Sequence, residues 1–277
     1  MDYTRRFGGI ARLYGEVGLD RFAQAHVCVV GIGGVGSWVA EALARSGVGT
    51  LTLIDLDNVA ESNVNRQIHA LESQFGRPKV DAMAGRIREI NPQCTLITRE
   101  EFVEPDNLER LIGGQFDYLV DCIDAYKTKA ALIAHCRRHK IRIITVGGAG
   151  GQSDPLKIRL ADLSKTQHDP LLAKTRKLLR KSYRFPKNPQ RRFDISCVYS
   201  DEQQVYPDGQ GAVCSVKPEA GSPGHGLHCG GFGSAMTVTA TFAMVATAHV
   251  LKKLSVGRRS LRGGHEVPAA EASEEVE

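Results

Sequence analysis

Short apolar runs alternate along the first half of the chain with segments whose apolar residues recur at helical spacing. The runs cover residues 27–30, 51–55, 94–98, 118–123 and 141–146, and helical spacing covers residues 37–46, 79–90 and 128–138. A strand that is apolar throughout is typical of a parallel sheet buried on both faces. The pattern therefore predicts an α/β fold with a doubly wound, mainly parallel sheet and helices on both faces.

The alternation stops near residue 151, and this change predicts a C-terminal extension. Basic residues dominate 164–193, which we interpret as a flexible insertion, and the small residues from Ser234 to Leu254 predict a long helix. We expect five parts along the chain: an N-terminal arm and helix (1–26), a nucleotide-binding core (27–163), the basic insertion (164–193), a C-terminal part that completes the domain (194–256), and a disordered acidic tail (257–277).

The first apolar run leads into a glycine-rich turn, VCVVGIGGVG, which contains Gly31, Gly33, Gly34 and Gly36. A strand that enters a helix through glycines brings unpaired N–H groups and the positive helix end together, and these attract phosphate. Asp55 ends the next strand, 19 residues beyond Gly36, where a carboxylate can accept from a ribose hydroxyl. This Rossmann-like arrangement predicts a nucleotide site. The spacing also fits the dinucleotide pattern, so a nicotinamide oxidoreductase or a non-catalytic nucleotide sensor stays open.

Four further residues are expected at the same edge of the sheet. Asn63 and Arg66 lie in the long polar segment after Asp55, Lys79 begins the next helix, and Asp124 follows the fourth strand. Ligands bind beyond the carboxyl ends of the strands in such sheets. A carboxylate there suits Mg²⁺, and two cations suit a triphosphate that is attacked at its α-phosphorus. The combination favours ATP with Mg²⁺ over a nicotinamide cofactor.

The cysteines indicate a reducing compartment. The seven cysteines form no C-x-x-C pair, which argues against a disulfide framework and a tetrahedral cysteine zinc site. The N-terminus has no apolar signal segment, and we expect a cytoplasmic protein. Cys229 lies in a glycine-rich loop beside His225 and His228. It is a candidate nucleophile or sulfur acceptor. The alternative is that Cys229 is only a small residue in a turn and takes no part in chemistry.

Six motifs occur in order: GIGGVG, LTLIDLDNV, SNVNRQIHA, GRPKV, INP and DCID. Over about residues 5–150 the chain resembles the adenylation domain of the ubiquitin-activating-enzyme superfamily, which includes the adenylyltransferases of the thiamine and molybdopterin pathways. The resemblance implies a homodimer that binds MgATP in the core over 27–163. It implies these roles: Gly34 at the phosphates, Asp55 on the ribose, Asn63, Arg66 and Lys79 at the triphosphate, Asp124 on Mg²⁺, and Arg12 reaching the ATP of the partner subunit. Ala125 departs from the family, which usually has Asn there.

Further segments extend the resemblance to about Leu254: RFGGIARLYG, GGAGGQSDP, DLSKT before DPL, and GFGSAMTVTATFA. They resemble the dehydratases that act on threonylcarbamoyladenosine in tRNA. This branch implies ATP-dependent cyclisation of the threonylcarbamoyl group, with release of AMP and pyrophosphate. It is also linked to sulfur transfer, which implies a cysteine desulfurase or its sulfur acceptor as a partner. The alternative is an adenylyltransferase for a ubiquitin-like sulfur-carrier protein, which commonly carries C-x-x-C zinc pairs that this chain lacks.

The basic segment between residues 165 and 192 holds ten Lys or Arg and one acid, Asp169. Such a run is typical of contacts with nucleic-acid phosphates, and Tyr183 and Phe185 could stack on bases. The candidate tRNA-binding residues are Lys174, Arg176, Lys177, Arg180, Lys181 and Arg184. The alternative is a solvated surface loop.

The long small-residue helix also has the length of a membrane span, because residues 230–250 contain no charged side chain. Its threonines, histidine and alanines disfavour insertion. We therefore expect a helix packed in a core or a dimer interface and no stable membrane partner. A membrane-associated helix is kept as the minor alternative.

Overall fold

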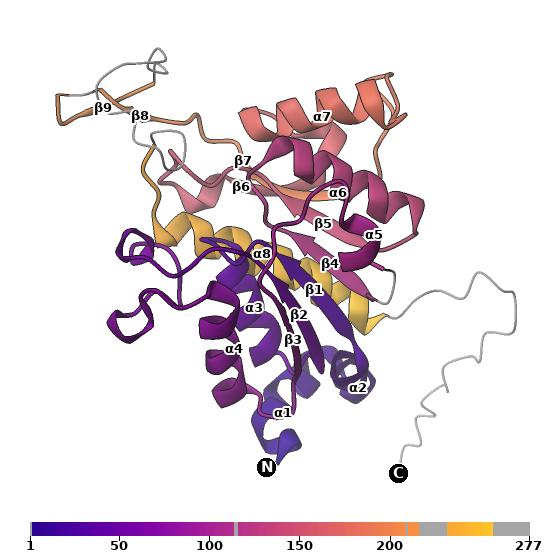
Figure 1. Cartoon of the computed structure of the whole chain (residues 1–277). Helices are drawn as coiled ribbons and strands as arrows, with labels where there is room; N and C mark the ends of the chain where they lie inside the picture. The colour runs from indigo at the N-terminus through magenta and orange to yellow at the C-terminus, as the bar shows by residue number, and fades with distance from the viewer. Residues whose placement is uncertain (1, 114–115, 209, 216–231, 257–277) are drawn as a thin grey trace, which may run out of the picture.

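The structure is a computed structural model of the chain, which describes residues 2–113, 116–208, 210–215 and 232–256 (Figure 1). Cys229, His225, His228 and the predicted acidic tail lie outside the described residues. A seven-stranded sheet forms the centre, in the order β3-β2-β1-β4-β5-β7-β6. Its strands are β1 (His26–Val30), β2 (Thr50–Ile54), β3 (Thr95–Arg99), β4 (Tyr118–Asp121), β5 (Ile143–Val146), β6 (Ile158–Asp162) and β7 (Ser196–Ser200).

The helices that surround the sheet follow the strands along the chain. They are α1 (Tyr3–Tyr14), α2 (Glu16–Gln24), α3 (Gly36–Arg45), α4 (Lys79–Ile90), α5 (Leu108–Leu111), α6 (Tyr126–Arg138), α7 (Pro170–Ser182) and α8 (Met236–Ser255). Short 3₁₀ turns cover η1 (Glu61–Asn63), η2 (Glu72–Gln74), η3 (Pro155–Lys157) and η4 (Leu163–Lys165). A separate two-stranded hairpin joins β8 (Tyr206–Pro207) to β9 (Val213–Cys214).

The sheet has a switch point beside β1. β1 pairs in parallel with β2 on one side and with β4 on the other. The chain leaves β1 through α3 toward β2, and leaves β4 through α6 toward β5, so the two connections run outward in opposite directions. Such a point opens a crevice at the carboxyl ends of the strands. Only β6, which pairs with β7, is antiparallel within this sheet.

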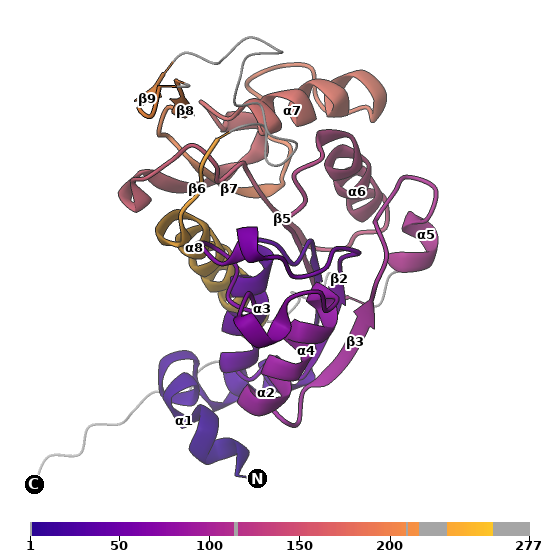
Figure 2. The ribbon, with the colours of Figure 1, turned by 60° about the vertical axis from the view of Figure 1, so that its left-hand side comes forward.

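Alternate side chains of β1 enter two separate cores. Val27 and Val29 pack with side chains of α3, α4 and α8, whereas Cys28 and Val30 pack with those of α5, α6 and α7. Figures 1 and 2 show α8 beside α3 on one side of the sheet and α6 on the other. Because both faces are covered, every residue of β1 after His26 is buried, as the continuous apolar run requires.

The fold class predicted from the sequence is confirmed, with shifts at the element ends. The helix predicted over 79–90 has those bounds in α4, and most strands begin or end one or two residues from the expected positions. The first connection is tight: the Gly31 N–H donates to the Ile54 carbonyl, 2.9 Å away, and φ at Gly31 is +86°.

The expectation of a flexible insertion over 164–193 is wrong. α7 forms in this segment, with the Asp169 carboxylate accepting from the Leu172 N–H at its start and Pro170 in its first turn. Leu172 and Leu179 are fully buried in the core shared with α6. Phe185 is also buried, stacked edge to face on Phe193 with ring centroids 5.0 Å apart. It therefore serves the core and does not offer a face to a base.

α8 packs along α3 and brings the C-terminal part of the described chain to the nucleotide-binding half. Its buried residues include Val238, Phe242 and Ala246, which join the core under β1. No helix in the part of the chain that the structure describes is long and apolar enough to cross a bilayer. The predicted packing in a core is the arrangement that α8 adopts.

Candidate active site

The glycine turn after β1 is tightly packed at two of its glycines and open at a third. A Cβ at Gly36 would lie 1.8 Å from the Gly31 carbonyl oxygen, and one at Gly31 would lie 3.1 Å from the Cys122 carbonyl after β4. A Cβ at Gly33 would meet nothing within 4 Å. Gly31 and Gly36 therefore shape the turn, whereas Gly33 keeps an open approach to the N-terminus of α3, where a phosphate would be favoured.

Asp55 follows β2 and holds the glycine turn. Its carboxylate accepts from the Ile32 N–H at 2.6 Å and from the Asp57 N–H at 2.8 Å. Burial raises the pKa of the Asp55 carboxyl, and the nearby Lys79 charge and the two N–H donors act against this rise. Each carboxylate oxygen has a second lone pair, so Asp55 can still accept from a sugar hydroxyl.

Arg66 is held against the glycine turn by contacts from α3 and α8. A Cβ at Gly34 would meet the Arg66 Cδ at 3.2 Å and the Thr239 methyl of α8 at 3.3 Å. The Trp38 indole N–H donates to the Arg66 carbonyl (2.9 Å), and the Arg66 guanidinium donates to the Ser62 carbonyl (2.8 Å). Arg66 therefore lies beside the same turn that binds Asp55.

The neighbouring Asn63 is buried, and its side-chain oxygen accepts from the Ala60 N–H at 3.1 Å. This bond closes the η1 turn and orients the amide. The Asn63 Nδ2 group donates no hydrogen bond to another residue in the part of the chain that the structure describes. The remaining Nδ2 donors are therefore the groups that could meet an anionic oxygen.

Lys79 stands at the first position of α4 with only 7 % of its side chain exposed. Its ammonium contacts the Asp57 carboxylate at 2.7 Å, and its backbone N–H donates to the Asp57 carbonyl at 2.9 Å. Asp57 is two residues after Asp55, so the cation lies near the Asp55 carboxylate and opposes the rise in its pKa that burial causes. A compact ammonium in this position suits a polyphosphate.

Asp124 lies three residues beyond the end of β4, next to the part of the turn that touches Gly31. It is exposed, and it makes no hydrogen bond or ion pair that the structure records with another described residue. An exposed carboxylate beside a phosphate-binding turn fits Mg²⁺, which commonly takes one or two protein carboxylates together with phosphate oxygens and water.

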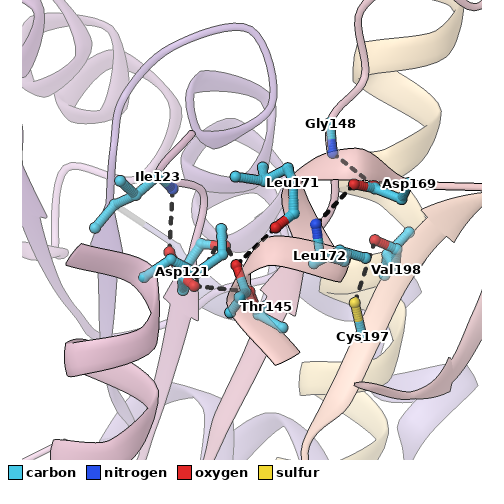
Figure 3. Close-up of polar contacts among 11 residues, drawn as sticks. Asp121, Ile123, Thr145, Gly148, Asp169, Leu171, Leu172, Cys197 and Val198 are labelled. Atoms are coloured by element: carbon cyan, nitrogen blue, oxygen red, sulfur yellow. Dashed lines mark hydrogen bonds and ion pairs between the residues drawn. The ribbon is translucent and has the colours of Figure 1, made fainter. Parts of the chain in front are cut away.

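The sequence analysis did not predict a buried polar cluster at the end of β4, around Asp121 (Figure 3). The Lys129 ammonium and the Asp121 carboxylate, both without exposure, lie 2.8 Å apart, and the Thr145 hydroxyl donates to Asp121 at 2.7 Å. The other Asp121 oxygen accepts from the Ile123 N–H at 3.1 Å. The cluster thus fixes the turn that presents Asp124, and removing one charge would cost about 3–5 kcal/mol.

Asp169 plays a similar part at the end of β5. Its carboxylate accepts from the Gly148 N–H at 2.9 Å and from the Leu172 N–H at 2.9 Å, so it joins the glycine loop to the start of α7 (Figure 3). Burial raises the pKa of Asp169 despite these donors. A Cβ at Gly147 would lie 2.0 Å from the Asp169 oxygen, which explains the glycine there.

Several buried polar atoms near the turn have no hydrogen-bond partner in the described residues. They belong to Ser37 on α3 and to Gln67 and His69 in the segment after Arg66. His69 is 1 % exposed, and burial followed by the charges of Lys79 and Arg86 lowers its pKa to about 4. Unpartnered polar atoms of this kind are costly in a closed core, so a ligand or water beside them is expected.

Arg12 is not brought to this site within one chain. It is an exposed residue in the last turn of α1. α1 packs at the C-terminal end of α3, where the Tyr3 hydroxyl donates to the Gly47 carbonyl at 2.6 Å. The glycine turn lies at the N-terminal end of α3, the end opposite this contact.

The basic residues of α7 form a surface that begins beside the Asp124 turn. The Lys174 ammonium lies 5.8 Å from the ring centre of Tyr126, two residues after Asp124. A hollow of about 340 Å³ on α7 is lined by Ala173, Arg176, Lys177, Arg180, Lys181 and Lys187. Arg176 and Arg180 are half-buried and also serve the fold: the first donates to the Thr166 hydroxyl, and the second lies 5.1 Å from the centre of the Phe193 ring.

The other four candidate tRNA-binding residues face solvent. Lys174, Lys177, Lys181 and Arg184 are exposed. Cys229 lies outside the described residues, so its geometry is not described. Among the site residues expected from the sequence, the structure brings together the glycine turn, Asp55, Asn63, Arg66 and Lys79, with Asp124 on the adjoining turn.

Comparison with known proteins gives consistent matches over most of the chain. The profile of the ThiF family matches residues 3–267. The tRNA threonylcarbamoyladenosine dehydratase of Escherichia coli (strain K12) is 52 % identical over 252 residues, which is 91 % of this chain and 94 % of that protein. Crystal structures of the Escherichia coli dehydratase in complex with ATP and with AMP each superimpose with a TM-score of 0.81 at 49 % identity, covering 91 % of this chain and 95 % of theirs.

Proposed function

This chain belongs to the ThiF family, and on that premise we propose that it is an ATP-dependent dehydratase of threonylcarbamoyladenosine in tRNA. The proposal states that it adenylates the carboxylate of the threonylcarbamoyl group and closes that group into a ring. The support from relatives is the similarity to a dehydratase of this name over nearly the whole chain.

One observation carries the proposal: two cations meet the glycine turn that binds Asp55. Arg66 lies against Gly34, and Lys79 lies beside Asp55 in the same crevice. A nicotinamide site does not need two such charges. A triphosphate does, because negative charge grows on the α-phosphate and on the departing pyrophosphate.

The chemistry then follows from the substrate. A carboxylate oxygen attacks the α-phosphorus of ATP, the bond to pyrophosphate breaks, and an acyl-adenylate forms. The ureido nitrogen of the same group then attacks the activated carbonyl and displaces AMP, so the net change is loss of water. An oriented intramolecular nucleophile reaches effective concentrations on the order of 10⁵ M. No nucleophilic side chain of the protein is required.

The residues of the chain hold the reactants in this proposal. Asn63, Arg66 and Lys79 bind the triphosphate, Asp55 accepts from the ribose, and the N–H groups of the glycine turn meet the phosphates. ATP enters as its magnesium complex, and Asp124 is the residue that would hold the metal. The buried Asp121–Lys129 pair keeps the Asp124 turn in place.

tRNA is proposed to lie on the basic surface of α7. Four basic residues of this surface are exposed, and none of them forms an ion pair with an acidic side chain among the described residues: Lys174, Lys177, Lys181 and Arg184. The Lys174 ammonium also lies near the ring of Tyr126, at the Asp124 turn. Phosphate contacts along this surface would lead the modified adenosine toward the nucleotide. The support is the continuity between the basic surface and the catalytic crevice.

We also propose a homodimer in which Arg12 reaches the nucleotide of the partner subunit, because α1 lies far from the glycine turn of its own chain. A tRNA substrate and buried thiols such as Cys28 and Cys197 fit a cytoplasmic site of action. A cysteine desulfurase or sulfur-acceptor partner, which would act through Cys229, stays a prediction.

The test measures AMP release from ATP with two preparations of the same tRNA, one carrying the threonylcarbamoyl group and one lacking it. We expect AMP only with the modified tRNA, together with a mass loss of one water on the nucleoside. Lys79→Met should lower the AMP rate by about 10²–10³-fold, the usual cost of removing one charge-stabilising donor.

The control for the charge is Lys252→Met, because Lys252 is exposed in the last turn of α8, at the opposite end of that helix from Thr239 and the glycine turn, and it should keep the wild-type rate. Equal AMP release with both tRNAs would remove the proposed substrate. AMP release that depends instead on a small protein with a Gly-Gly terminus would favour the sulfur-carrier adenylyltransferase.

A further inference from the structure

A cluster of metal-ligand side chains lies on α5 and α6, away from the catalytic crevice. Glu109 of α5, His135 of α6 and His139, the residue that follows the last turn of α6, bring one carboxylate oxygen and two ring nitrogens within 4.8 Å of one another. His135 and His139 are one helical turn apart, so both rings project from the same face of α6. The nucleotide site, by contrast, adjoins the N-terminal end of α6.

The distances suit a single small cation between the three groups. The Glu109 carboxylate oxygen lies 3.7 Å from the His135 Nδ1 and 3.2 Å from the His139 Nε2. Ligands about 2.0–2.1 Å from a tetrahedral zinc ion are about 3.3 Å apart. The two Glu109 separations lie on either side of that value, and the two ring nitrogens lie within 4.8 Å of each other, so rotation of the two solvent-facing side chains can bring all three groups to one ion.

The hydrogen bond of His135 selects the nitrogen that faces the cluster. The His135 Nε2 lies 3.1 Å from the Ile112 carbonyl oxygen. A carbonyl only accepts, so Nε2 carries the proton and Nδ1 keeps its lone pair for a ligand. Metal-binding histidines usually donate their other ring N–H to a carbonyl or carboxylate in this way.

The surroundings allow an ion to enter. The His135 side chain is 5 % exposed, whereas His139 is 37 % and Glu109 is 69 % exposed. One ligand is therefore held rigidly in the protein, and the other two face solvent. The two imidazole rings stack with centroids 4.3 Å apart, so the partly exposed His139 ring must turn out of this stack for both ring lone pairs to meet one ion.

We propose that Glu109, His135 and His139 form a zinc-binding site that ties α5 to α6, with water at the fourth position. Two imidazoles and one carboxylate are a ligand set that zinc and neighbouring transition metals accept. α6 spans 13 residues, or about 20 Å at 1.5 Å per residue. The site is therefore at the end of α6 opposite the Asp124 turn, and we assign it a structural role.

The test titrates Zn²⁺ into the metal-free full chain by calorimetry and follows Co²⁺ binding by visible absorption. We expect one equivalent in the wild type, and a midpoint of thermal unfolding that rises with added Zn²⁺. His139→Ala and Glu109→Gln should each lower the affinity for Zn²⁺ by at least about tenfold, because replacing even a residue that only hydrogen-bonds to a metal ligand causes a loss of this size. Both residues are partly exposed, so their replacement spares the core.

Two controls make the assignment specific. His168→Asn removes an exposed histidine whose φ is +53°, a conformation that asparagine tolerates. The triple variant His225→Ala/His228→Ala/Cys229→Ala removes the other group of possible ligands in the sequence. Both variants should still bind one equivalent of Zn²⁺. The proposal would be overturned if the wild type bound no Zn²⁺, if His139→Ala bound it as tightly as the wild type, or if the triple variant lost it.

Discussion

Gly36 and Gly33 belong to the same turn but have opposite surroundings. At Gly36 a methyl group would collide with the Gly31 carbonyl, whereas at Gly33 it would meet open space. The first glycine is therefore needed for the fold, and the second for the approach of a phosphate. This difference separates the structural and binding roles of a motif whose residues look equivalent in the sequence.

We predict that Gly36→Ala destabilises the protein strongly and that Gly33→Ala does not. Gly33→Ala should keep the free energy of unfolding within about 1 kcal/mol, since its φ is not positive and the space is open. It should nevertheless weaken ATP binding, because the methyl group occupies the phosphate approach. Urea unfolding and ATP titration of both variants make the check. ATP affinity that is unchanged in Gly33→Ala would place the phosphates elsewhere.

His69 makes the stability of the protein depend on pH. Its pKa in the folded chain is about 4, because burial and the charges of Lys79 and Arg86 oppose protonation, against 6.5 for an ordinary histidine. Between these values the unfolded chain binds the proton and the folded chain does not. Stability is therefore complete above pH 6.5 and is lost as the pH falls toward 4.

The predicted loss is about 2 kcal/mol between about pH 7.5 and about pH 5, from 1.36 kcal/mol per unit of pKa. His69→Gln should remove this part of the pH dependence, since glutamine does not titrate. Urea unfolding at the two pH values measures it, with His168→Asn as the matched histidine control. An identical pH dependence in wild type and His69→Gln would contradict the shift.

The side chains of the site were predictable to different degrees. The glycine turn and Asp55 follow from local spacing, because one strand and one helix fix their positions. The placement of Arg66 depends on α8, since Asn65 donates to the Ser234 carbonyl at 2.7 Å across 169 positions of sequence. Lys129 gives no local signal at all, because a lysine in an apolar helix face is ordinarily expected at the surface.

At the scale of elements, α7 shows how a strong charge pattern can hide a helix. Ten basic residues suggested a loop, yet Leu172, Thr175 and Leu179 are buried at helical spacing on one face. The Asp-Pro start was a capping signal present in the sequence. Lys174, Lys177 and Lys181 are on the exposed face, so helix and charge are compatible, and the positive surface is held rigidly beside α6.

We predict that Lys177→Glu/Lys181→Glu weakens tRNA binding and flattens its dependence on salt. Each phosphate contact that is lost should reduce the slope of log affinity against log salt by about 0.7–0.9. Lys252→Glu/Lys253→Glu on α8 changes the net charge equally and is the control. Binding to tRNA is measured by fluorescence anisotropy at several salt concentrations. Equal weakening by both pairs would reduce the effect to net charge.

At the scale of the whole molecule, the position of Arg12 makes one chain incomplete as a catalyst in the proposed mechanism. We predict that Arg12→Ala and Asp124→Ala are each inactive alone but recover activity when mixed. Half of the dimers in an equal mixture are hybrids, and each hybrid holds one intact site. Activity should therefore reach on the order of a quarter of the wild-type value.

The assay is AMP release after the two variants have exchanged subunits. Mixing Arg12→Ala with wild-type protein that has been heated to loss of structure gives the background. No recovery in the mixture, with a dimer present by light scattering, would show that Arg12 does not act across the subunits.

α8 supplies the wall against which the glycine turn rests, since the Thr239 methyl group faces Gly34 and Asn65 binds the chain just before the helix. On the ribosome, the nascent chain makes the phosphate-binding turn about two hundred residues before this wall is synthesised. These residues must therefore be translated before the pocket can close on its nucleotide. Until then, the apolar side of α3 is a surface that a chaperone could recognise.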